Sequence, residues 1–148
     1  MDASRKIYAF DKINWIVACD ILLTYPDFKE TFKIHTDARA FQIVAVIRQK
    51  VKPISFYIRK LTDAQQQFTE MDRELLSIVE TLKEFRTALL DHKLRIYSDN
   101  KNFTCTNFNT DRLLRWILII EEYGPDIEYI KGGKNISRHT INITLKWE

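Results

Sequence analysis

The sequence predicts a mixed α/β domain, in which helices flank a five-stranded sheet of three antiparallel strands followed by parallel strands. Three strand-like segments precede the longest amphipathic segment of the chain, and strands and helices then alternate. With 148 residues, of which 45% are hydrophobic and 12% aromatic, the chain has enough apolar material for one core. Only three glycines and three prolines occur, and no linker-like stretch indicates a second domain.

The first thirty residues predict a helical arm ahead of that domain. From Ser4 to Cys19 the apolar residues recur at roughly helical spacing, with Ser4 as the expected N-cap. Tyr25-Pro26-Asp27 then ends the arm. We therefore expect an arm over residues 1–30 and the α/β domain over residues 31–148.

Three segments rich in β-branched and aromatic residues predict an antiparallel meander: Thr31–Thr36, Gln42–Gln49 and Pro53–Ile58. A helix over Glu70–Leu90 follows, capped by Thr69. Its apolar residues form one stripe: Leu75, Ile78, Val79, Leu82, Phe85 and Leu89. Because this helix makes the crossover, the next strand, Lys93–Ser98, should run parallel to the first.

The rest of the chain predicts a short helix over Asn100–Asn107, a longer helix over Asp111–Tyr123 that Gly124-Pro125 terminates, and a fifth strand over Asp126–Lys131. The final segment, Ser137–Trp147, is compatible with a closing helix or with an extended tail. Its apolar residues alternate like those of a strand.

Charge and cysteine content exclude several classes of protein. The formal net charge is only +3 with 29% charged residues, so any nucleic-acid contact must come from a local patch. Cys19 and Cys105 are too few and too far apart for a disulfide framework or zinc site, and we expect buried free thiols. The apolar run before Asp20 is too short for a membrane span or secretory signal, which predicts a soluble, intracellular protein.

Three acidic residues fall at the predicted ends of elements. Asp37 ends the first strand, Glu74 lies in the first turns of the long helix, and Asp99 ends the fourth strand. If the two strands are parallel neighbours, both aspartates emerge at one end of the sheet, and the packed helix can add the glutamate. Divalent cations such as Mg²⁺ or Mn²⁺ make such a cluster tolerable and can promote phosphodiester hydrolysis.

Taken singly, each of these acids has an ordinary structural explanation. An aspartate after a strand is commonly a turn former, and a glutamate early in a helix complements the helix dipole.

Seven short motifs, in this order and spacing, resemble the ribonuclease H domain of gypsy-type LTR retroelement reverse transcriptase polyproteins. They are Tyr25-Pro26-Asp27-Phe28, His35-Thr36-Asp37-Ala38, Lys52-Pro53-Ile54-Ser55-Phe56-Tyr57, Arg59-Lys60-Leu61-Thr62, Arg73-Glu74-Leu75-Leu76-Ser77-Ile78-Val79, Tyr97-Ser98-Asp99-Asn100-Lys101 and Ile127-Glu128-Tyr129-Ile130-Lys131-Gly132. Together they span Tyr25 to about Asn135. The segment from Phe10 resembles the connection between polymerase and ribonuclease H in such polyproteins.

The resemblance implies a ribonuclease H-like fold and a Mg²⁺- or Mn²⁺-dependent endonuclease that cuts the RNA strand of an RNA/DNA hybrid at a two-metal site. It puts Asp37, Glu74 and Asp99 at metal-ligand positions, with His139 where the family usually has a fourth aspartate. A neutral imidazole is a softer ligand, so affinity for Mg²⁺ should fall.

Other positions also depart from the family pattern. Arg39, Gln42 and Val44 stand where the family tends to have small residues and glycines, so they could crowd the site. Asn100 replaces a usual histidine, and the final helix motif is replaced by Thr140-Ile141-Asn142-Ile143-Thr144, which has poor helix propensity.

Two readings of function remain open from the sequence. In the first, the domain is a hydrolase, active or weakened, and Lys101, Arg112 and Arg115 contact phosphates of the hybrid, although each would also suit a solvated face. In the second, the fold is a noncatalytic pseudoenzyme that binds protein subunits of a larger complex through its N-terminal arm and C-terminal tail.

Overall fold

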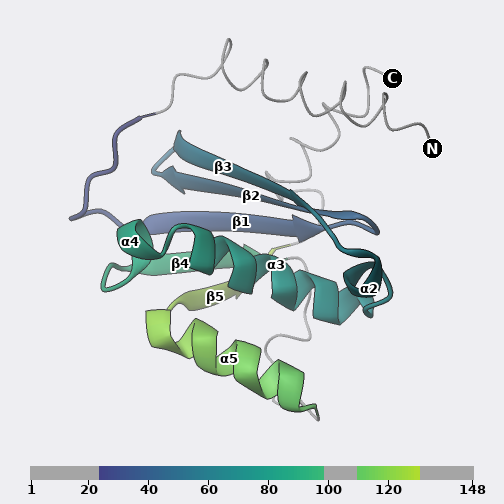
Figure 1. The fold of residues 1–148 in the computed structure, drawn as a ribbon. Helices are drawn as coiled ribbons and strands as arrows, with labels where there is room; N and C mark the ends of the chain where they lie inside the picture. The colour runs from purple at the N-terminus through teal and green to yellow at the C-terminus, as the bar shows by residue number, and fades with distance from the viewer. Residues whose placement is uncertain (1–23, 99–109, 131–148) are drawn as a thin grey trace, which may run out of the picture.

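A computed structural model describes residues 24–98 and 110–130 of the chain. Its five strands form one sheet in the order β3-β2-β1-β4-β5 (Figure 1). The strands are β1 Phe32–Ala38, β2 Gln42–Gln49, β3 Lys52–Lys60, β4 Leu94–Ser98 and β5 Asp126–Tyr129. β1, β2 and β3 are antiparallel neighbours, whereas β4 is parallel to both β1 and β5. The predicted mixed five-stranded sheet is confirmed.

The main helix, α3 (Glu70–Glu84), makes the crossover between β3 and β4 and packs against β1, β2 and α5 (Figure 1). It begins as predicted, because the Thr69 side chain accepts a hydrogen bond from the backbone N–H of Asp72. The prediction of one helix as far as Leu90 was wrong. The backbone leaves helical geometry at Phe85 (φ −104°, ψ 27°), which packs edge-on to Tyr57, and the chain resumes as the short α4 (Arg86–Leu89).

A short helix that we did not predict, α2 (Asp63–Gln66), connects β3 to α3. Thr62 and Gln65 form a capping box, in which each side chain accepts a hydrogen bond from the other residue's backbone N–H. This reciprocal pair satisfies two backbone donors at once, which stabilises a helix of a single turn.

α5 (Asp111–Tyr123) has the bounds that the sequence predicted. Thr110 caps its start by accepting a hydrogen bond from the N–H of Leu113, and Gly124 ends it with a left-handed φ of 58°. Glycine adopts this conformation without steric cost, so its position fixes the helix end. Within the described part of the chain, no helix is long and apolar enough to cross a bilayer.

The core consists of two clusters of buried side chains. The larger cluster fills the space between the sheet and helices α3 and α5, and its residues include Phe32, Ile34, Ile78, Val79, Leu82, Leu94, Ile96 and Ile120. The smaller one contains Ile43, Leu61 and Leu76. Trp116 is partly buried and packs against both clusters. The smaller cluster therefore supports the end of the sheet at which β1 passes into β2.

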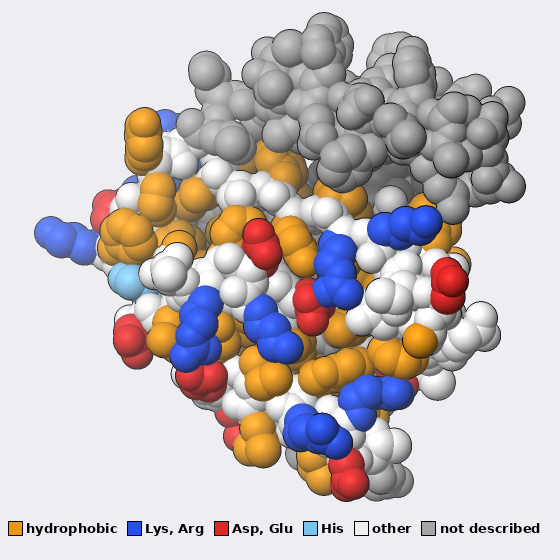
Figure 2. Space-filling model, in the orientation of Figure 1, with side chains coloured by type: hydrophobic (Ala, Val, Ile, Leu, Met, Phe, Trp, Pro, Cys, Tyr) orange, Lys and Arg blue, Asp and Glu red, His pale blue; other side chains and the backbone are white. Residues whose placement is uncertain are grey.

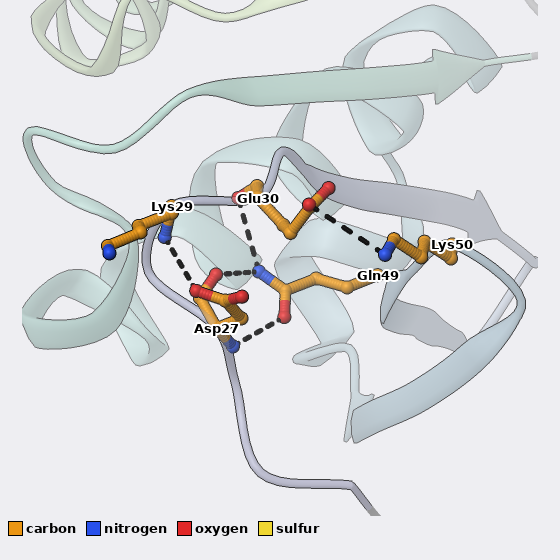
Figure 3. A network of polar contacts seen from close by, with 5 residues as sticks. All are labelled: Asp27, Lys29, Glu30, Gln49 and Lys50. Atoms are coloured by element: carbon orange, nitrogen blue, oxygen red, sulfur yellow. Dashed lines mark hydrogen bonds and ion pairs between the residues drawn. The ribbon is translucent and has the colours of Figure 1, made fainter.

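The segment before β1 is held to the end of β2 by one amide side chain (Figure 3). The buried Gln49 accepts a hydrogen bond from the N–H of Asp27 and donates to the carbonyl oxygens of Asp27 and Glu30. An exposed ion pair between Lys50 and Glu30 lies beside it. These contacts fix residues 27–30 of the predicted arm against the sheet, whereas residues 1–23 of that arm lie outside the described residues.

Candidate active site

Asp37 lies inside β1, at the end of the sheet where the chain turns into β2. We predicted that this strand would end at Thr36, but it continues to Ala38, because Asp37 pairs with Val44 and Ala38 with Ile43 across the β1–β2 ladder. Asp37 is only 1% exposed. A carboxylate so far removed from water needs hydrogen bonds or cations to compensate its charge.

Glu74 reaches the same place from α3. It lies in the second turn of that helix and is 2% exposed. Its Oε1 accepts a hydrogen bond of 3.3 Å from the backbone N–H of Ala38, the residue after Asp37. The strand and the helix therefore bring the carboxylate of Glu74 to the backbone of the residue that follows Asp37.

The other two predicted acid or ligand positions, Asp99 and His139, lie outside the described residues. β4 is parallel to β1, with Tyr97 beside His35, and its last residue, Ser98, is buried. Across residues 24–98 and 110–130, no three acidic, histidine or cysteine side chains form a group that could hold a metal ion. Of the four predicted positions, Asp37 and Glu74 lie among the described residues, and both are buried.

Arg39 interacts directly with Asp37. Its Nε lies 3.2 Å from Asp37 Oδ2, and its side chain is 37% exposed. The sequence indicated only that a bulky residue here could crowd the site. An ion pair with Asp37 was not predicted, although the arginine two residues after the aspartate was the available signal. The guanidinium therefore puts a permanent positive charge beside Asp37, which is a predicted metal ligand.

His35, two residues before Asp37 on β1, forms a second cluster that sequence reasoning missed. Its ring stacks on Tyr97 at 4.6 Å between centroids, and Arg48 Nε donates to its Nε2 at 3.0 Å. Burial lowers the pKa of His35 to about 4, and the positive charges of Arg48 and Lys33 act in the same direction. The ring is therefore neutral at physiological pH.

The predicted phosphate-binding residues differ in their surroundings. Arg112 donates to Asp72 Oδ2 at 2.6 Å and its guanidinium lies over the ring of Phe68, so its head group already has partners. Arg115 is exposed on α5, and its Nε donates to the carbonyl of Asp111. Lys101 lies outside the described residues. On the face shown in Figure 2, basic side chains are interspersed with acidic and apolar ones.

A comparison with protein families decides the assignment. The model of the RNase H-like domain found in reverse transcriptase matches residues 27–123, which contain strands β1 to β4, helix α5 and the positions of Asp37, Glu74 and Asp99. The chain belongs to this family. The resemblance suggested by the seven motifs is thereby confirmed for the family and the fold.

Similar proteins are retroelement polyproteins. The chain is 36% identical over 132 residues to the Retrovirus-related Pol polyprotein from transposon 297 of Drosophila melanogaster, covering 87% of this chain and 12% of that protein. It is 33% identical over 144 residues to the polyprotein from transposon gypsy of the same species, covering 90% and 14%. The chain thus spans about one eighth of the length of these relatives, at an RNase H-like domain of a retroelement reverse transcriptase.

Solved structures share the fold at low sequence identity. The foamy viral protease-reverse transcriptase in complex with double-stranded DNA has a TM-score of 0.71 at 15% identity, covering 89% of this chain and 30% of that one. The same viral protein in complex with an RNA/DNA hybrid has a TM-score of 0.69 at 16% identity, covering 89% and 19%. At these identities the likeness establishes the fold of the domain.

Proposed function

We propose that this domain cleaves the RNA strand of an RNA/DNA hybrid with the help of divalent cations, as the hydrolytic domain of a retroelement reverse transcriptase. The observation that carries the proposal is the hydrogen bond between Glu74 Oε1 and the N–H of Ala38. It brings the carboxylate of a helix to the strand residue next to Asp37, and both acids are buried. Buried acidic side chains that lie close together on two packed elements are typical of functional sites, which supports a catalytic use of their charge.

The donor set suits Mg²⁺ or Mn²⁺. Carboxylate oxygens are hard ligands, which these ions prefer, and Asp37 and Glu74 present them from two rigid elements of the fold. Two bound cations would supply neutralisation of the developing charge and an activated water for in-line displacement at phosphorus. Asp37 and Glu74 would hold them, and the packing of α3 on β1 would keep the two carboxylates in place.

Asp99 completes the proposed set as the third carboxylate. It follows Ser98, the last residue of β4, in the chain, and β4 runs parallel to β1. Parallel neighbouring strands deliver the residues after their carboxyl ends to one edge of a sheet. This topology supports the assignment of Asp37, Glu74 and Asp99 as one catalytic group.

His139 occupies the fourth position of the proposed set and should alter the choice of metal. A neutral imidazole adds no negative charge and binds Mn²⁺ better than Mg²⁺. We therefore expect the domain to cleave faster with Mn²⁺ than with Mg²⁺, and to need a higher concentration of Mg²⁺ than of Mn²⁺.

The substrate is proposed to be a hybrid because one of the structural neighbours was solved with an RNA/DNA hybrid. Arg115 is an exposed candidate for a phosphate contact, and we propose Lys101 for the same role. Arg112 would first have to leave Asp72, so it is the weaker candidate of the three. Phosphate contacts of this kind make binding weaken as salt rises.

A cleavage assay tests the proposal. A labelled RNA/DNA hybrid, the same RNA alone and a DNA duplex are incubated with the protein in Mn²⁺, in Mg²⁺ and in EDTA. Cleavage of the RNA only in the hybrid, lost in EDTA and in Asp99→Asn, is the expected result. Absence of cleavage in both metals, with no metal binding in a calorimetric titration, would contradict the proposed enzymatic function.

Two observations favour a second candidate function, a noncatalytic subunit of a larger protein complex. Arg39 already neutralises part of the charge on Asp37, which a domain without metals would require. In addition, Leu114 and Leu118 on α5 and Ile127 and Tyr129 on β5 are exposed apolar side chains that a protein partner could cover. Residues 1–23 of the N-terminal arm and the C-terminal tail, proposed as further partner contacts, lie outside the described residues.

A further inference from the structure

The contact between Arg39 and Asp37 suggests a specific role for the arginine at the proposed metal site. We propose that Arg39 is a built-in counter-cation that competes with the divalent cation for Asp37 and thereby lowers the metal affinity of this domain. This inference deepens the proposed function and rests on it. Its basis is the 3.2 Å contact between Arg39 Nε and Asp37 Oδ2, with the carboxylate 1% and the arginine side chain 37% exposed.

The backbone fixes the arginine where it can reach the carboxylate. Arg39 is the first residue after β1, and its N–H donates to the carbonyl of Gln42 at 2.8 Å. The other end of the connection is held by a hydrogen bond from the N–H of Leu61 to the carbonyl of Phe41, also 2.8 Å. Positions 39–41 contain neither glycine nor a residue with positive φ, and the two hydrogen bonds hold the backbone from which the Arg39 side chain extends.

Electrostatics makes the arginine and the metal alternatives. A guanidinium is charged at every physiological pH, and it engages Oδ2 of the same carboxylate that would bind a cation. A divalent ion binding there must release the guanidinium or tolerate its positive charge a few ångströms away. The free energy of the ion pair is therefore subtracted from the free energy of metal binding.

The same contact compensates part of the buried charge of Asp37 before any metal binds. Consecutive residues of the chain serve the two carboxylates, because the Ala38 N–H donates to Glu74 and the Arg39 side chain to Asp37. A part-exposed ion pair has a modest free energy, which corresponds to roughly a 3- to 30-fold loss of metal affinity. Arg39 would thus influence the reaction indirectly, by changing how tightly Asp37 binds the metal ion.

The test compares Arg39→Gln with the matched variant Arg86→Gln by calorimetric titration with Mn²⁺. Arg86 on α4 also donates to a carboxylate, that of Glu122 at 2.7 Å, so both variants lose one paired positive charge. We expect Arg39→Gln to bind Mn²⁺ roughly 3- to 30-fold more tightly than wild type, and Arg86→Gln to stay within about twofold. Arg39→Lys, which keeps the charge, should remain close to wild type.

A thermal readout gives an independent check without substrate. In EDTA the melting temperature of Arg39→Gln should fall, because Asp37 loses its counter-ion. Mn²⁺ should then raise the melting temperature of this variant by more than it raises that of wild type. Asp37→Asn, which lacks the charged ligand, should show the smallest rise.

The outcomes separate this inference from the proposed function. If wild type and Arg39→Gln bind Mn²⁺ equally, or Arg86→Gln gains as much affinity as Arg39→Gln, the role of Arg39 is wrong. The proposed function then still stands, provided that wild type cleaves the hybrid and Asp37→Asn does not. If neither wild type nor Arg39→Gln binds Mn²⁺, the inference and the metal site fail together.

Discussion

The start of β1 is held mainly by amide hydrogen bonds and ring contacts, whereas its end buries two carboxylates. At the start, which we call the neutral end, the Gln49 amide binds the backbone of residues 27–30, and Phe28, Phe32 and His92 pack their rings together. At the other, the acidic end, the chain buries Asp37 and Glu74 and sets Arg39 against the first of them. The two ends of one strand therefore differ in whether they bury charged side chains.

This difference indicates that the neutral end contributes mainly to stability and the acidic end mainly to function. Neutral hydrogen bonds and ring contacts at the neutral end stabilise the fold at little desolvation cost. Burying carboxylates at the acidic end is unfavourable for folding unless a cation compensates, and such arrangements are typical of functional sites. Substitutions at the acidic end should consequently impair activity more than stability, and substitutions at the neutral end should do the reverse.

The largest expected effect is that of Asp37→Asn on catalysis. Loss of a charged ligand should lower the single-turnover rate of hybrid cleavage at least about 1,000-fold. The free energy of unfolding in EDTA, from urea titration, should be equal to that of wild type or higher, because an amide carries no buried charge. The control variant Glu122→Gln, at an exposed and distant position, should keep its activity. If Asp37→Asn instead lowers the free energy of unfolding clearly below that of wild type, the acidic end has a structural role.

The regular elements were the most predictable part of the molecule from sequence. The bounds of β2 and α5 agree with the prediction, because a β-branched run defines the strand and Gly124 ends the helix in the only conformation that favours glycine. The parallel pairing of β1 with β4 followed from the long helix between them. The strand end and the helix start also indicated that Glu74 would lie near the end of β1, where its Oε1 accepts a hydrogen bond from the N–H of Ala38.

Features that depend on tertiary contacts were not predictable. No glycine or proline marks the break at Phe85, where a side chain packs on Tyr57. The ion pair of Arg39 depends on the path of a three-residue connection, which local propensity does not specify. The capping box of Thr62 and Gln65 was readable from their spacing and shows that a single-turn helix can have a clear signal.

The next effect in size is the loss of stability in Gln49→Ala. The variant removes one donated and one accepted bond to Asp27 and a bond to Glu30, so we expect the free energy of unfolding to fall by about 1–3 kcal/mol. Urea titration measures it. Mn²⁺ affinity and cleavage rate should stay near those of wild type. Lys50→Gln, which breaks only an exposed ion pair beside Gln49, should change stability by less than about 0.5 kcal/mol.

His35 lies in the middle of β1, between the two ends, and its lowered pKa predicts that stability depends on pH. Its pKa of about 4 in the folded state lies below the value of 6.5 in the unfolded chain, so the unfolded state takes up the proton first. The stability contributed by the neutral ring is complete above pH 6.5 and is lost as the pH falls toward 4. After allowance for solvent screening we expect a loss of about 1–2 kcal/mol.

The variant His35→Gln isolates this effect from the titration of the acids. A glutamine can still accept from Arg48 but has no proton to gain, so its urea midpoint should fall less between pH 6.5 and 4 than that of wild type. Equal slopes for the two proteins would show that His35 does not control acid stability. Both proteins are compared in EDTA, so that metal binding does not contribute.

The smallest effect should come from the ion pair between Arg86 and Glu122, which joins α4 to α5 far from either end of β1 in sequence. Its hydrogen bonds raise the pKa of Arg86 and lower that of Glu122, yet both side chains are about half exposed. Water and salt screen such a pair, so Arg86→Gln and Glu122→Gln should each lower the melting temperature by less than about 3 °C. The double variant should lose no more than the larger single loss, and high salt should remove the difference. If either variant lowers the melting temperature by more than Gln49→Ala does, the junction of α4 and α5 contributes more to stability than the neutral end of β1.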